Sequence, residues 1–283
     1  MPRRRQRRRD GAPPKQVNPL KAQYLKLLED LPADWLAASF ADPSLPFVVD
    51  VGCGDGEWVL AAAASRRGRA YNFLGLEVRK ECVAAANAKR GLDGPCNALC
   101  VAANAAAGDV ATLLAACGTV AACAFRCPDP HWKGAHRNRR MITRPLLGQC
   151  AAALSESGFL FVSTDVVEVA DDVLAQLRRP PVFVEEVYVS LRGESPRTDR
   201  RGPAGGAAEA EALFLGPEAL PTEREGYVGR LGGTMSRCLL RLRAGARDEA
   251  LRAGAASVSR RDSAPADVVE ESAGALMGLF GDE

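Results

Sequence analysis

The stretch Val48-Val49-Asp50-Val51-Gly52-Cys53-Gly54-Asp55-Gly56 decides the fold. It continues a short apolar run that begins at Phe47 and predicts a buried strand, and a helix is predicted just beyond it. Glycines in such a loop permit a tight turn and let a ligand approach the backbone closely. Because open α/β sheets bind ligands at the carboxyl ends of their strands, this loop is predicted to hold a nucleoside-bearing cofactor.

Strands and helices alternate outward from this loop. One or two amphipathic helical segments are expected over 20–40, before the first strand. Helices are predicted at 58–64, 80–89, 110–117, 141–154 and 169–177, and strands at 47–51, 71–76, 98–101, 120–125, 158–163, 182–189 and 236–242. This alternation is typical of an α/β fold, with a mostly parallel sheet and helices on both faces.

Composition divides the chain into three parts. Residues 1–19 are basic and proline-bearing and predict a disordered arm, whether a transit peptide, an RNA-binding segment or a nuclear signal. Residues 20–243 are expected to form the folded domain that carries the glycine loop, with an insertion at about 202–220. Residues 244–283 are expected to form a mobile tail. No stretch is long and apolar enough to span a bilayer.

The formal net charge is only +2, but the positive charges gather in two runs, at Arg3 to Arg9 and at Lys133 to Arg144. This distribution favours an acidic partner, with nucleic acid the first choice. The nine cysteines are scattered and mostly beside alanine or valine, as expected for small buried hydrophobes. We expect no metal site, since no cysteine pair has the short spacing of a zinc knuckle.

The residues around the glycine loop indicate which cofactor it binds. The carboxylate of Asp50 would repel a pyrophosphate, but it suits a positively charged cofactor without phosphate, such as S-adenosylmethionine. Glu77 ends the second predicted strand, where an acid can accept hydrogen bonds from two ribose hydroxyls. Asn104 follows the third strand, and its amide either holds the adenine edge or forms a turn.

The segment Pro128-Asp129-Pro130-His131-Trp132-Lys133 follows the fourth predicted strand, on the same rim. Two prolines restrict the backbone on both sides of Asp129. A purine N7 has a free lone pair and needs no general base, so a fixed carboxylate would stabilise the positive charge that develops on the ring. His131 or Trp132 could stack on a base. Alternatively, Asp129 forms a turn, Trp132 fills the core, and Arg137, Arg139 and Arg140 form a solvated face.

Together with Ser163-Thr164-Asp165 and Thr222-Glu223-Arg224-Glu225, these motifs resemble the tRNA (guanine-N7-)-methyltransferase family, TrmB-type in bacteria. The resemblance covers about 17–242. It implies a seven-stranded class I methyltransferase fold and methylation at N7 of a variable-loop guanine, guanine 46, in tRNA. It places cofactor contacts at Asp50, Gly52, Gly54, Gly56, Glu77, Arg79, Asn104 and Asp129, with Asp129 also catalytic, and substrate contacts at Lys133, Asp165, Thr222 and Glu225.

The chain departs from the family pattern at a few positions. Bacterial members usually have Glu at Asp50 and Asp at Asn104, and Arg126 interrupts a strand end that is usually apolar. Asn104 looks like the eukaryotic and plant branches, and 16–20 looks like plant organellar members. Animal and fungal members work with a WD-repeat partner and bacterial members act alone, and we expect no obligate partner here.

Two other functions stay open on sequence alone. The chain could be an RNA-binding module with weak catalysis, a reading that Arg126 and the altered site contacts favour. It could also methylate small molecules or proteins, although the two basic runs favour a polyanionic substrate.

Overall fold

The structure is a computed structural model that describes residues 17–28, 31–91, 96–131, 139–178, 184–191, 198–199, 210–215 and 219–242. Nearly all of the predicted arm, the whole predicted tail and much of the predicted insertion lie outside these residues, as do Trp132, Lys133 and Arg137. No helix within the described ranges combines the length and the apolarity that crossing a membrane requires.

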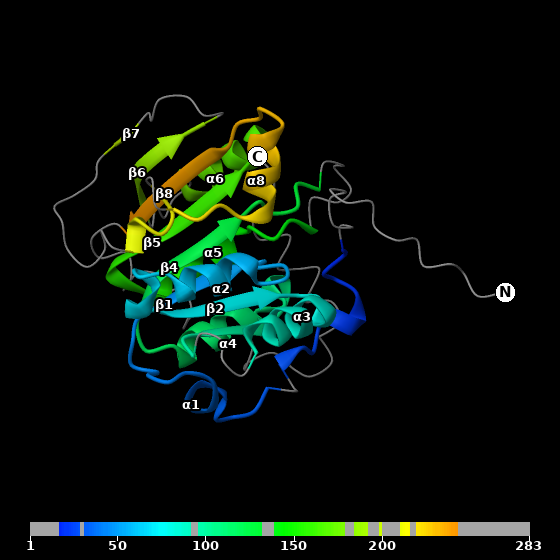
Figure 1. Ribbon diagram of the computed structural model, residues 1–283. Coiled ribbons are helices and arrows are strands. Elements are labelled where there is room, and N and C mark those ends of the chain that lie inside the picture. Colours follow the sequence, from blue (N-terminus) through cyan, green and yellow to red (C-terminus); the bar gives the residue numbers. More distant parts are fainter. Residues whose placement is uncertain are drawn as a thin grey trace.

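The described residues form one sheet of eight strands in the order β3-β2-β1-β4-β5-β8-β6-β7 (Figure 1). Neighbours from β3 through β5 pair in parallel, whereas β8 is antiparallel to both β5 and β6. The strands are β1 (Phe47–Val51), β2 (Asn72–Glu77), β3 (Ala98–Ala102), β4 (Val120–Arg126), β5 (Leu154–Thr164), β6 (Val184–Ser190), β7 (Thr198–Asp199) and β8 (Ser236–Leu242). This order brings the carboxyl ends of β1, β2 and β4 together at the middle of one rim.

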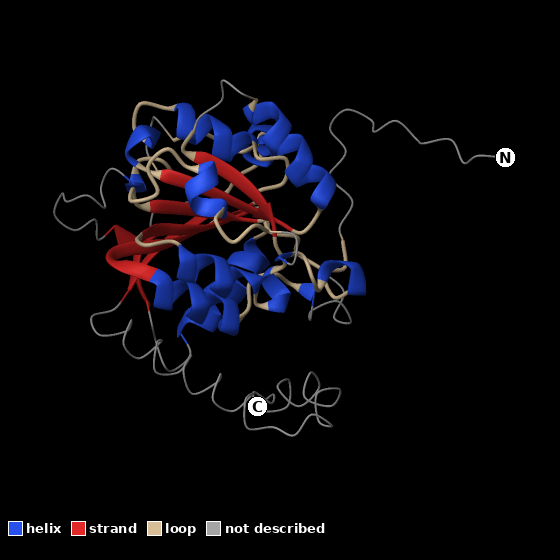
Figure 2. Cartoon of the chain, turned by 90° about the horizontal axis from the view of Figure 1, so that it is seen from below, coloured by secondary structure: helices blue, strands red, loops and turns tan. Residues whose placement is uncertain are grey.

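Helices cover both faces of the sheet, which lies between them as the central layer in Figure 2. They are α1 (Trp35–Ser39), α2 (Glu57–Ala64), α3 (Lys80–Arg90), α4 (Asp109–Ala116), α5 (Arg144–Ala153), α6 (Val167–Arg178) and α8 (Glu223–Arg230). Short 3-10 turns lie at Ala22–Tyr24, Gly68–Ala70 and Ala105–Ala107.

Successive residues of β1 point to opposite faces of the sheet, so the strand contributes side chains to two hydrophobic cores. Val49 packs in the core that includes residues of α1, α4, α5 and α6. Val48 packs in the other, with Trp58 of α2, Ala86 of α3 and Phe214. All five residues of β1 are buried, which explains why the strand is a continuous apolar run broken only by Asp50.

The predicted α/β fold is confirmed, with three differences in detail. The sheet gains an eighth strand, since the two-residue β7 pairs with the edge of β6. In the segment 20–40 the structure gives the short helices Ala22–Tyr24 and Trp35–Ser39 in place of longer amphipathic ones. Helix α8 was not predicted, because its sequence carries two glycines, at Gly226 and Gly229, and little apolar periodicity.

Candidate functional site

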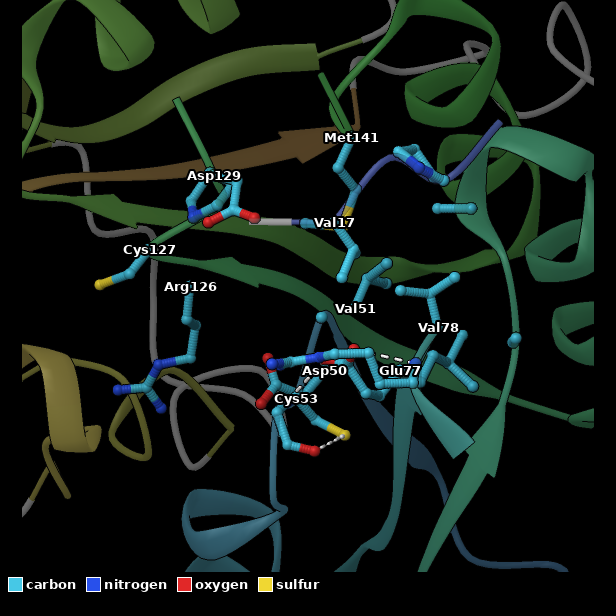
Figure 3. A pocket seen from close by; sticks show the side chains of 18 of the residues that line it. Val17, Asp50, Val51, Cys53, Glu77, Val78, Arg126, Cys127, Asp129 and Met141 are labelled. Atoms are coloured by element: carbon cyan, nitrogen blue, oxygen red, sulfur yellow. Dashed lines mark hydrogen bonds and ion pairs between the residues drawn. The ribbon is translucent and has the colours of Figure 1, made fainter. Parts of the chain in front are cut away.

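A cavity of about 240 Å³ opens at the carboxyl ends of the central strands (Figure 3). Residues from β1, β2 and β4 and from the loops that follow them line it, together with the amino-terminal segment and the start of α8. Of the predicted site residues, the lining includes Asp50, Gly52, Gly54, Glu77, Arg79, Asn104, Asp129 and Thr222. The cavity therefore joins the predicted cofactor loop to the predicted catalytic carboxylate.

The glycine loop turns through left-handed backbone conformations, with φ of 87° at Gly52, 61° at Gly54 and 72° at Gly56. Side chains strain such conformations, which explains the repeated glycines. Gly56 differs from the other two, because it does not line the cavity. A Cβ atom at Gly56 would lie 2.7 Å from the Cβ of Ala86 and 2.9 Å from Sγ of Cys100. Gly56 therefore allows α3 and β3 to pack closely against the start of α2, away from the cavity lining.

Asp50 lies in the wall of the cavity, only 3% exposed. Its Oδ1 has no hydrogen-bond donor among the described residues. Burial raises the pKa of Asp50 to about 6, although the charge of Arg126 opposes the shift. A buried carboxylate without a donor is costly to leave unpaired, so this site fits a ligand that brings a positive charge or N–H groups.

The Glu77 carboxylate joins the loop to the end of β2. Its Oε2 accepts a hydrogen bond from the N–H of Gly54 at 3.1 Å. Its Oε1 accepts one from the Arg79 N–H at 3.1 Å and one from Arg79 Nε at 2.8 Å. Glu77 therefore holds the loop in place. Its Oε1 already accepts two bonds, whereas Oε2 accepts one and keeps a lone-pair site for a further donor such as a hydroxyl.

The Asn104 side chain binds the amino-terminal segment. Its Nδ2 donates to the carbonyls of Pro19 at 2.9 Å and Tyr24 at 3.0 Å, and its Oδ1 accepts from the N–H of Ala106 at 3.0 Å. Both amide hydrogens are therefore used. The predicted contact with an adenine edge therefore stays a prediction that only Oδ1, which keeps one lone-pair site, can fulfil. Asn104 also fixes a segment whose Val17 and Pro19 line the cavity.

Asp129 stands at the mouth of the cavity, between two residues with unusual backbone geometry. Cys127 has φ of 50° and His131 has φ of 42°, values that few residues other than glycine adopt. Partial burial raises the pKa of Asp129, while His131 and Arg79 oppose the shift. His131 is only 5% exposed but lines the cavity, so its predicted stacking on a base stays a prediction. The strained turn aims Asp129 at the cavity that the glycine loop lines.

Helix α8 accounts for the predicted Thr-x-x-Glu motif. Thr222 is its N-cap and forms a capping box with Glu225, whose Oε2 accepts from the Thr222 N–H at 2.9 Å. Glu225 is only 7% exposed and pairs with Arg126 at 2.5 Å, so it faces the protein interior. Burial alone would raise its pKa, but Arg126, the Thr222 N–H and Arg237 hold the pKa of Glu225 below its usual value.

These contacts separate two of the predicted substrate residues from the cavity. Glu225 is buried in the capping box, and Asp165 forms an ion pair with Arg224 of α8. Neither residue lines the cavity, whereas Thr222 and Arg224 do. Arg224 is also 5.5 Å from the ring centroid of Tyr227. The described geometry thus gives Asp165 and Glu225 positioning roles for α8, and Lys133 lies outside the described residues.

Part of the second basic run holds helix α6 rather than facing solvent. Arg140 pairs with Asp172 of α6 at 3.1 Å and donates to the Pro130 carbonyl at 3.2 Å. Arg144 donates to the Gln176 carbonyl at 2.7 Å. Arg139 instead lines the cavity. Arg140 therefore also fixes the proline-bracketed turn that carries Asp129.

The cysteines are free thiols, and a group of acidic side chains gathers at the cavity. Five of the nine cysteines are buried: Cys100, Cys117, Cys123, Cys150 and Cys238. Asp55, Glu57 and Glu223 all line the cavity, and their carboxylate oxygens lie within 4.8 Å of one another. Lys89 already pairs with Asp55 at 2.8 Å and Glu57 at 3.3 Å, which balances part of their negative charge.

Sequence reasoning did not assign Arg126 to the cavity. It lies at the end of β4, only 7% exposed, and belongs to the lining. The signal was present, because a charged residue in a buried strand requires a partner. That partner, Glu225, follows ninety-nine positions later in the chain, and no local pattern connects the two.

Comparisons with known proteins agree with this arrangement. A family model described as "Putative methyltransferase" matches residues 44–197. The tRNA (guanine-N(7)-)-methyltransferase of Synechococcus sp. strain WH7803 is 33% identical over 228 residues, 80% of this chain and 85% of the relative. The enzyme of the same name from Synechococcus sp. strain JA-2-3B'a(2-13) is 31% identical over 74% of this chain and 75% of the relative.

Solved structures resemble the chain more distantly. An rRNA methylase from Streptococcus thermophilus covers 74% of this chain and 92% of its own, with a TM-score of 0.39 and 12% identity. We draw no argument from a likeness of this size.

Proposed function

The chain belongs to the tRNA (guanine-N(7)-)-methyltransferase family, and from this premise we propose that it transfers a methyl group from S-adenosylmethionine to N7 of guanine 46 in the variable loop of tRNA. It is a methyltransferase, and S-adenosylmethionine is its cofactor. The position of the target guanine and the residues that act on it are the parts that we propose. Asp129, on the rim of the cavity that the glycine loop lines, is the observation that carries the proposal.

The cavity wall fits this cofactor. The orphaned carboxylate of Asp50 requires a cationic or donor group, and S-adenosylmethionine offers both an ammonium and a sulfonium. Gly52 and Gly54 leave the loop backbone open to a ligand. Oε2 of Glu77, which accepts from the Gly54 N–H, keeps a lone-pair site for a ribose hydroxyl. The cofactor supplies an electrophilic methyl group.

Asp129 acts on the guanine. The N7 atom attacks with its own lone pair, so the protein has to align the base rather than remove a proton. A carboxylate is a pure acceptor, and it matches the N1–H and exocyclic amine on the Watson–Crick edge of guanine. It also stabilises the positive charge that develops on the methylated ring. The two prolines and the strained residues Cys127 and His131 keep Asp129 in place while this occurs.

The wall of the cavity beside Asp129 carries cations suited to the RNA backbone. Arg139 and Arg224 both line the cavity, and they come from the segment before α5 and from the start of α8. Thr222, at the start of α8, lies in the same wall. These residues are our candidates for phosphate and sugar contacts that hold the tRNA while its base enters.

The proposal predicts site-specific methylation. Incubating the full chain with unmodified tRNA and methyl-labelled S-adenosylmethionine should place label at N7 of guanine 46, mapped by chemical cleavage at the modified base. Asp129→Asn removes the charge but keeps the size, and it should lower turnover by at least about a hundredfold, as loss of a charge-stabilising group does. Glu156→Gln is the matched control, since Glu156 is exposed at the opposite end of β5.

Label in protein or small molecules but none at guanine N7 would contradict the proposed substrate. Unchanged turnover in Asp129→Asn would remove the role given to Asp129. A chain that binds tRNA but neither S-adenosylmethionine nor its demethylated product would instead be an RNA-binding protein of this fold.

A further inference from the structure

Arg126 is a buried cation in the wall of the cofactor cavity. Its guanidinium carbon lies 4.3 Å from the centroid of the Trp58 ring and 5.8 Å from that of Phe214. Figure 3 shows the side chain directed toward α8 and standing beside Asp50, on the side of the cavity away from Asp129. The residue is 93% buried, since only 7% of its surface is exposed.

Only one of the three guanidinium nitrogens has partners. Nη2 donates to Glu225 Oε2 at 2.5 Å and to the Leu220 carbonyl at 3.2 Å. Nε and Nη1 have no acceptor within the part of the chain that the structure describes. The indole Nε1 of Trp58, beneath the guanidinium, also lacks an acceptor. Buried donors normally have partners, so this wall is built for an acceptor from outside the chain.

The charged side chains around Arg126 suit a ligand that carries one positive and one negative charge. Arg126 and Arg237 contribute two positive charges, and Glu225, which pairs with both, contributes one negative charge. Asp50 is the second carboxylate, and its Oδ1 has no donor among the described residues. A zwitterion would satisfy both the free guanidinium nitrogens and the free carboxylate without unbalancing the cluster.

The strand order says which part of the cofactor meets these groups. Glu77 ends β2, Asp50 is on β1 and Arg126 ends β4, and these strands are neighbours in that order. If the ribose binds at Glu77, the opposite end of the cofactor reaches β1 and β4. That end of S-adenosylmethionine is an amino acid, with one ammonium and one carboxylate.

We propose that Arg126 binds the carboxylate and Asp50 the ammonium of the amino-acid end of S-adenosylmethionine. Nε and Nη1 of Arg126 donate to the carboxylate, and Asp50 accepts from the ammonium. This inference rests on the proposed function, because it takes S-adenosylmethionine as the cofactor. Arg126, one of the residues that depart from the family pattern, is then a cofactor contact and does not indicate weak catalysis.

The test compares ligands that differ only at that end. S-adenosylhomocysteine carries the complete amino acid, and 5′-methylthioadenosine lacks it. In calorimetric titrations, Arg126→Met should weaken S-adenosylhomocysteine binding about tenfold or more, as for loss of a charged hydrogen-bonding partner. Binding of 5′-methylthioadenosine should change less than about twofold. Arg237→Met is the matched control, because Arg237 also pairs with Glu225 but does not line the cavity; it should affect both ligands equally.

Arg126→Met removes the ion pair between Arg126 and the buried Glu225. Circular dichroism and thermal melting must therefore check that the variant still folds. The double variant Arg126→Met/Glu225→Gln removes both buried charges and should show the same ligand difference. Decarboxylated S-adenosylmethionine needs no variant at all: the unaltered chain should bind it more weakly than S-adenosylmethionine, by about tenfold or more.

The outcomes separate the two proposals. If the unaltered chain binds none of these ligands, the cofactor assignment and hence the proposed function fail. If it binds them and Arg126→Met weakens both equally or neither, only the role of Arg126 fails. Equal affinity of the unaltered chain for S-adenosylmethionine and its decarboxylated form would overturn it as well.

Discussion

At the residue scale, the site depends on charged groups that the fold holds in unfavourable surroundings. Asp50 is buried without a hydrogen-bond donor, and Arg126 is buried with two unpaired nitrogens. Groups of this kind reduce stability. They are common where binding or catalysis requires a preorganised charge. The residues that the protein itself satisfies, Glu77 and Glu225, instead hold the loop and helix α8 in place.

The raised pKa of Asp50 predicts how stability changes with pH. Its folded pKa of about 6 lies above the ordinary value of 3.8, so the folded state binds the proton more tightly. The resulting stabilisation is complete below the unfolded pKa and is lost as the pH rises through about 6. Asp50→Asn removes this dependence, and from pH 4 to pH 7 the difference in unfolding free energy should shift toward the variant by roughly 2 kcal/mol.

Urea unfolding of both proteins at several pH values, without cofactor, measures this difference. The comparison between the two proteins cancels the other titrating groups, including Glu225, whose lowered pKa acts in the opposite direction. A constant difference between them across this range would show that Asp50 is ionised normally.

At the element scale, segments far apart in the sequence complete a cavity that the sheet begins. Residues 17–24 pack over the β3 end because Asn104 binds the carbonyls of Pro19 and Tyr24. Helix α8 reaches the opposite wall through its capping box and through Arg126. Two side chains therefore fix the borders of the cavity. Asn104, just after β3, holds the amino-terminal segment, and Arg126, at the end of β4, holds α8.

Replacing Asn104 tests the first of these borders. Asn104→Ala removes two hydrogen bonds to the amino-terminal segment, so that segment should open more often. Trypsin should then cleave faster after the exposed Lys21, and S-adenosylhomocysteine should bind several-fold more weakly. Mass spectrometry of timed digests measures the first effect and calorimetry the second.

Asn97→Ala is the matched control. The Asn97 amide also donates to backbone carbonyls, those of Ala63, Gly68 and Tyr71, but these lie away from the amino-terminal segment. It should lower stability without selectively exposing Lys21. Equal cleavage rates in Asn104→Ala and the unaltered chain would mean that other contacts hold the segment.

At the scale of the whole molecule, local patterns predict the sheet well and the walls of the site less well. The strand at 47–51 and the positions of Gly52, Glu77 and Asp129 follow from apolar runs and from the residues that end them. The roles of Asn104, Arg126 and Glu225 depend on partners at least eighty positions away. No periodicity records such pairs, so local spacing does not predict that Asn104 binds the amino-terminal segment or that Arg126 pairs with Glu225.

The uneven charge of the whole chain gives the last prediction. The net charge is only +2, yet six arginines lie between Arg3 and Arg9, and Arg139 and Arg224 line the cavity. If these cations bind phosphates, each contact releases a counterion, and the logarithm of the tRNA dissociation constant rises linearly with the logarithm of salt concentration. Filter-binding titrations of the full chain between low and moderate salt should show a loss of about tenfold or more. S-adenosylhomocysteine is the internal control, because a small ligand in a buried site should lose little affinity over the same range. Affinity for tRNA that is independent of salt would contradict phosphate contacts by these arginines. Recognition would then depend on contacts to the bases made by other residues.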